Sequence, residues 1–155
     1  MTKTPILVGL FVLLVFAFCP IVNRAQSIGE LDNGNFRYHD GCGSPQIWPK
    51  GRGRYGGYGV FYVVPNNGGN GAVMKIDGQV VTLRRTKKAN YPRSLRRGSK
   101  FYESYAGNAY SVRIDYTATR VGVTDHGEWG NYAVTITVTK GKVSKSVSAL
   151  SSDAC

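Results

Sequence analysis

The only two histidines of the chain each stand beside an acidic residue. His39 precedes Asp40, and His126 lies within Asp125-His126-Gly127-Glu128. Two imidazoles could cleave a phosphodiester or a glycan as general base and general acid, and the same side chains could ligate a metal. Neither arrangement has the spacing of a known motif such as H-E-x-x-H. We therefore assign no catalytic residue, metal or cofactor, and keep a His-dependent hydrolase of phosphodiesters or glycans as an alternative.

A second feature that could do chemistry is a cluster of basic residues. Residues 84–100 contain eight cations and no acid, whereas the whole chain has a net charge of +11. Loss of a leader carrying Lys3 and Arg24 would leave +9, so almost all of the excess lies in this run. A concentrated basic loop between two strands attracts polyanions, and arginine offers bidentate contacts to phosphate, sulfate or carboxylate.

Aromatic residues lie in or beside the basic loop, where their rings could stack on sugars or bases. The candidate ligand-binding residues are Arg84, Arg85, Lys87, Lys88, Tyr91, Arg93, Arg96, Arg97, Lys100 and Tyr102. The expected partner is an anionic polysaccharide, lipopolysaccharide or an anionic membrane surface. A solvated loop that serves only solubility is the alternative. The sequence identifies neither the ligand nor the oligomeric state.

The first 25 residues have the layout of a secretory signal peptide. Lys3 precedes an apolar run over 6–18, and small residues follow around Ala25 and Ser27. The run is shorter than the roughly 20 apolar residues of a membrane span. An uncleaved anchor and lipidation of Cys19 are the alternatives. We expect a secreted or periplasmic protein, which would not meet intracellular nucleic acid.

Two cysteines remain after removal of the leader, Cys42 and Cys155. In an oxidising compartment, two cysteines suggest one disulfide bond. By loop closure such a bridge would stabilise the fold by about 4–5 kcal/mol. Free thiols and pairing between chains are the alternatives.

Alternating apolar and polar residues predict strands, and helix signals are nearly absent after the leader. The expected strands cover 58–64, 72–76, 79–84, 101–105, 109–121, 131–140 and 143–150. Asp77-Gly78 indicates a tight hairpin turn, because both residue types tolerate positive φ. Residues 26–155 are therefore expected to form a single all-β domain, an antiparallel β-sandwich or small β-barrel of six to eight short strands.

Two resemblances accompany this interpretation. The stretch Asn70 to Gly78, with Ser111 to Tyr116 and Val134 to Lys140 downstream, resembles an uncharacterised family of small secreted bacterial β domains. That resemblance implies fold and export but no mechanism.

The second resemblance is to periplasmic inhibitors of c-type lysozyme. An Asp-Gly turn between two strands, followed by Gly98-Ser99-Lys100-Phe101-Tyr102, is distantly similar to their Ser-Gly-x-x-aromatic segment. Arg97 stands where that family has its serine, and a basic loop would repel a basic lysozyme. The leading expectation remains a secreted non-enzymatic β domain that binds an anionic polymer or surface, with lysozyme inhibition as an alternative.

Overall fold

The computed structural model describes residues 26–31, 46–50, 71–125 and 127–152. Several expectations concern residues outside these ranges. They are the signal peptide over 1–25, the disulfide between Cys42 and Cys155, the histidines His39 and His126, and the strand over 58–64.

The described residues form strands and turns without a helix, which confirms the all-β class. The strands are β1 (Ile28–Gly29), β2 (Gln46–Pro49), β3 (Gly71–Ile76), β4 (Gln79–Lys87), β5 (Lys100–Gly107), β6 (Tyr110–Thr124), β7 (Gly127–Lys140) and β8 (Val143–Ser152). They form one antiparallel sheet in the order β1-β3-β4-β5-β6-β7-β8-β2. Among these strands the ladder ends at β1 and β2, so the sheet is not closed into a barrel.

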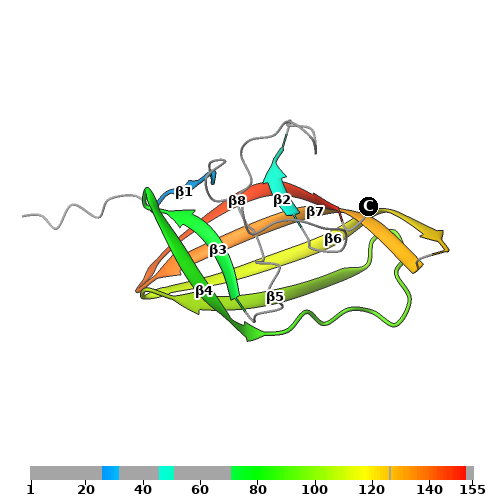
Figure 1. Ribbon diagram of the computed structural model, residues 1–155, viewed down its shortest axis with the longest axis horizontal. Coiled ribbons are helices and arrows are strands. Elements are labelled where there is room, and N and C mark those ends of the chain that lie inside the picture. Colours follow the sequence, from blue (N-terminus) through cyan, green and yellow to red (C-terminus); the bar gives the residue numbers. More distant parts are fainter. Residues whose placement is uncertain (1–25, 32–45, 51–70, 126, 153–155) are drawn as a thin grey trace, which may run out of the picture.

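Long strands β5–β8 lie side by side as a band, and β3 and β4 cross obliquely over one end of it (Figure 1). The sheet therefore curls, and apolar residues of β3 and β4 share one core with those of β5–β8. The buried core includes Ile47, Met74, Leu83, Val112, Ile114, Ile136 and Val138. We call the face of the sheet that carries these residues the inner face.

The alternation that predicted the strands decides which side chains reach solvent. On β6 the residues Val112, Ile114 and Tyr116 are buried, whereas Ser111 and Arg113, which alternate with them, are exposed. Successive side chains of a strand point to opposite faces. The opposite, outer face of β5–β8 is therefore polar and open to solvent.

The Asp77-Gly78 turn forms as expected. Asp77 has φ 51° and Gly78 has φ 78°, the left-handed backbone that a primed hairpin turn requires. The turn brings β3 and β4 together with Ile76 opposite Gln79. The Asp77 carboxylate accepts hydrogen bonds from the Ser27 backbone N–H and the Tyr110 hydroxyl, both at 2.8 Å.

Candidate functional site

The basic run does not form a single loop. Strand β4 extends through Lys87, three residues beyond the predicted end, and β5 begins at Lys100. Only residues 88–99 connect the two strands. Arg84, Arg85 and Lys87 therefore belong to strand β4 and not to the connecting loop. Long and β-branched side chains are compatible with a strand at these positions.

The end of β4 contains a register shift between Arg85 and Lys87. Arg84 lies opposite Ala106, and Lys87 lies opposite Ser104. A bulge adds one residue to one strand of a pair, so two positions an odd number apart can share a face. The bulge thus places both Arg84 and Lys87 on the outer face.

Arg85 is placed differently from the other cations, because it reaches the inner face. Its Nε donates a hydrogen bond to the Tyr105 hydroxyl at 3.2 Å and lies 3.9 Å from Glu103 Oε2. Glu103 is buried and also accepts hydrogen bonds from Tyr105 and Tyr116, at 2.8 and 2.7 Å. Arg85 therefore compensates a buried carboxylate and does not belong to the outer surface.

The two candidate stacking residues lie on different faces. The Tyr91 ring is 4.4 Å from the ring of Phe101, which in turn stacks on buried Tyr116 at 4.7 Å. Tyr91 thus packs on the outside of the inner aromatic cluster, and 57% of its surface remains exposed. Tyr102 instead lies on the outer face of β5, opposite Asp115.

Tyr102 lies between two cations on the outer face. The Lys87 ammonium donates a hydrogen bond to its hydroxyl and lies 4.6 Å from the ring centroid. The Arg113 guanidinium lies 3.8 Å from the same centroid. The hydrogen bond from Lys87, followed by the positive charges of Lys87 and Arg113, lowers the pKa of Tyr102 below its ordinary value. Negative charge is therefore favoured at this point of the surface.

The far end of the connecting loop is fastened to the sheet. Gly98 donates its backbone N–H to the Ala118 carbonyl at 2.7 Å, and Ala118 donates to the Ser99 carbonyl at 2.9 Å. Leu95 donates its backbone N–H to Glu128 Oε2 at 3.0 Å. Gly98 has φ 87°, a conformation that residues with a side chain rarely adopt. The loop thus leaves the end of β4 and turns back into β5 beside Ala118 of β6 (Figure 1).

Seven of the eight predicted cations remain exposed. These are Arg84, Lys87, Lys88, Arg93, Arg96, Arg97 and Lys100, which we call the basic strip. None of them forms an ion pair within the described ranges. Their charges are therefore not individually cancelled by the acids that the structure places.

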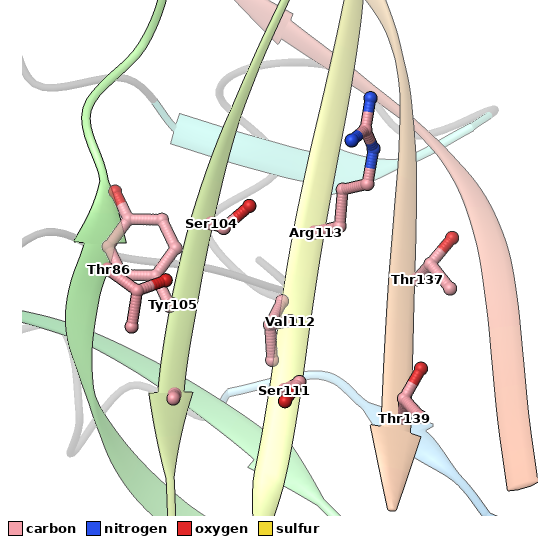
Figure 2. Close-up of a pocket in the computed structure, with 9 residues that line it drawn as sticks. Thr86, Ser104, Tyr105, Ser111, Val112, Arg113, Thr137 and Thr139 are labelled. Carbon is pink, nitrogen blue, oxygen red and sulfur yellow. The ribbon is translucent and has the colours of Figure 1, made fainter. Parts of the chain in front are cut away.

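The structure also brings together residues that the sequence analysis did not select. A shallow hollow of about 350 Å³ opens on the outer face across β4–β7. Its polar lining comes from Thr86, Ser104, Ser111, Arg113, Thr137 and Thr139, and we call it the outer hollow. Figure 2 shows the hydroxyls of Ser104, Ser111, Thr137 and Thr139 on three neighbouring strands, with the Arg113 side chain rising beside them. Only the register of β5, β6 and β7 reveals this grouping.

Arg113 is held in place at the edge of the outer hollow. Its Nε lies 2.9 and 3.0 Å from the Asp115 carboxylate oxygens, and its Nη2 lies 2.6 Å from Oδ1. Both side chains remain about half exposed, so this ion pair contributes little stability. The pair fixes the direction of the guanidinium, and the alternating pattern Ser-Val-Arg-Ile-Asp was the sequence signal that could have found it.

The described residues give no structural support to the other hypotheses drawn from the sequence. Those residues contain no group of three or more His, Cys, Asp or Glu side chains that could hold a metal. The same part of the chain has no helix long and apolar enough to cross a membrane. In the segment that resembles lysozyme inhibitors, Phe101 is buried in the core and Tyr102 is bonded to Lys87.

No protein-family model, curated protein or solved structure matches this chain.

Proposed function

We propose that this protein is an exported, non-enzymatic β domain that docks on an anionic polymer through its basic strip. The observation that supports the proposal is the set of seven exposed cations without an ion pair in the described ranges. Cations that have no ion pair among the described residues produce a positive potential that attracts polyanions before contact. The strip lacks three of the ten predicted residues, because Arg85 and Tyr91 serve the inner face and Tyr102 carries no positive charge.

The way in which the strip is held also favours docking. Lys87 and Arg84 project from a strand, and residues 95–99 are bonded to β6 and β7. Cations on a fixed scaffold lose less conformational freedom on binding than cations on a free loop. The strip is therefore suited to bind an extended polymer that contacts several of its cations at once.

Retention on immobilised heparin tests this proposal. The double variant Arg96→Gln/Arg97→Gln removes two charges of the strip, and Lys142→Gln/Lys145→Gln removes two exposed charges near the β7–β8 turn. We expect the first variant to elute at clearly lower salt than the wild type, and the second to elute close to the wild type. Contacts with a polyanion weaken as salt screens them.

Equal shifts for the two double variants would overturn the proposal, because net charge and not the strip would then govern retention. Wild-type protein that passes through the column at low salt would overturn it as well. Circular dichroism on all three proteins verifies that the sheet is retained.

A further inference from the structure

The outer hollow lies beside the basic strip and has a chemistry of its own. Strand pairing places Lys87, Ser104, Arg113 and Thr137 in one row across β4–β7, and places Arg84, Ala106, Ser111 and Thr139 in another. Neighbouring strands are about 4.8 Å apart. Small side chains at 104, 106 and 111 leave the depression that longer side chains would fill.

The lining of the outer hollow is rich in neutral hydrogen-bonding groups. Thr137 and Ser146 share one hydrogen bond at 2.8 Å, and Thr139 and Ser144 share another at 2.8 Å. A hydroxyl has one hydrogen and two acceptor lone pairs. Each pair thus keeps one hydrogen and several lone pairs for a ligand, which suits a molecule that itself carries many hydroxyls.

Positive charge borders the outer hollow where Arg113 lines it, and Lys87 lies nearby at the same tyrosine ring as Arg113. In the first row Ser104 lies between Lys87 and Arg113, each one strand away. Arg113 uses Nε and Nη2 for Asp115, so other N–H donors of its guanidinium remain. Both charged groups lie at the Tyr102 ring, so a carboxylate or sulfate beside Tyr102 and over Ser104 would receive hydrogen bonds from the N–H donors that Lys87 and Arg113 keep, while the Asp115 charge offsets one cation.

We propose that the outer hollow binds one acidic sugar residue of a polysaccharide. The ring hydroxyls bond to Ser111, Thr137 and Thr139, and the acidic group lies over Ser104 beside Tyr102, where Lys87 and Arg113 converge. This inference rests on the proposed function, because the same chain would continue along the basic strip. It specifies the polymer as an acidic polysaccharide, since a polyphosphate chain has no sugar hydroxyls to donate to the free lone pairs of the lining.

The test compares two polyanions on the full chain, a short oligogalacturonate and a polyphosphate of equal total charge. The variant Thr137→Val/Thr139→Val removes two hydroxyls without altering charge, and valine is favoured in strands. We expect this variant to bind oligogalacturonate about tenfold more weakly, as the loss of two hydrogen bonds implies. Polyphosphate binding should stay unchanged.

Thr135→Val is the matched control, because Thr135 lies on the same face of β7 outside the outer hollow. Lys87→Gln should weaken both ligands. In the wild type, the methyl NMR signals of Thr137 and Thr139 should shift with oligogalacturonate and not with polyphosphate. This NMR measurement uses the wild type, so it does not depend on whether a variant folds.

The outcomes separate the two proposals. Binding of both polymers with no effect of the valine substitutions would overturn the sugar subsite and leave the proposed function standing. Binding of polyphosphate alone, or of anionic vesicles alone, would also overturn the subsite. Absence of binding to every polyanion would overturn both.

Discussion

Glu103 is a charged side chain inside a β core, and its neighbours explain how it is tolerated. Two tyrosine hydroxyls donate to its oxygens, and Arg85 approaches from β4. Burial, followed by the charge of Glu103, raises the pKa of Tyr116 well above its ordinary value, so Tyr116 remains a donor. A buried charge that keeps its partners is retained at modest cost, whereas one that loses them is expensive.

Replacing Glu103 with glutamine should therefore destabilise the fold. The amide has one oxygen, so one of the two tyrosine hydroxyls would face an N–H group. We expect the free energy of unfolding to fall by about 1–3 kcal/mol, measured by urea denaturation. Ser104→Ala on the outer face of the same strand is the control and should change stability by less than about 0.5 kcal/mol. Equal effects of the two substitutions would contradict this role of Glu103.

The Asp77 carboxylate at the β3–β4 turn makes the stability of the fold depend on pH. The hydrogen bond from the Ser27 backbone, followed by that from the Tyr110 hydroxyl, lowers the pKa of Asp77 below 3.8. A carboxylate with a lowered pKa in the folded state contributes stability above its unfolded pKa, and this contribution disappears as pH falls through the folded pKa.

We therefore expect the wild type to lose stability below about pH 4, and Asp77→Asn to lose less of it over the same range. Asparagine tolerates positive φ, so the substitution removes charge without straining the turn. Tyr110→Phe, which removes one donor, should give an intermediate slope. Urea denaturation at a series of pH values measures all three, and parallel curves would show that Asp77 does not carry the effect.

Among the elements, β4 and the segment after it decide how the cations are displayed. The bulge before Lys87 brings two cations to the outer face, and hydrogen bonds to Ala118 and Glu128 fasten the far turn. Residues 95–99 are thus held against the sheet by hydrogen bonds.

Removing the Glu128 carboxylate should loosen this segment. In Glu128→Ala the Leu95 N–H loses its acceptor, so trypsin should cut after Arg96 or Arg97 several times faster. Asp125→Ala in the same hairpin should be cut at the wild-type rate, because no hydrogen bond joins Asp125 to the segment in the described ranges. Equal rates for both variants would mean that Glu128 does not fasten the loop.

At the scale of the whole molecule, one core joins strands near opposite edges of the described sheet. The cluster extends from Ile47 on β2 to Met74 on β3, with Ile114 fully buried on β6. Because these strands share buried apolar surface, we expect the sheet to unfold as one cooperative unit.

Ile114→Ala should accordingly destabilise the entire described sheet by about 2–5 kcal/mol. Trp48 on β2 and Trp129 on β7 report fluorescence from two regions of the sheet, and far-UV circular dichroism reports the strands. The two transitions should coincide in urea and move together in the variant. Separate midpoints would show that the edge strands unfold independently.

The sequence by itself determined the strands β3–β8, the Asp77-Gly78 turn and the position of the positive charge, but it did not indicate β1 or β2. These follow from local rules, because alternation of side chains and tolerance of positive φ are properties of neighbouring residues. Prediction of the strand ends was less successful, since the bulge that lengthens β4 depends on its pairing with β5.

Only the tertiary structure decided which candidate residues share a surface. It turned Arg85 inward to Glu103, placed Tyr91 against Phe101, and set Arg113 beside Tyr102 and the hydroxyls of β7. Residues far apart in the chain become neighbours through strand register, and register is set by the packing of the whole core. No local pattern contains that information.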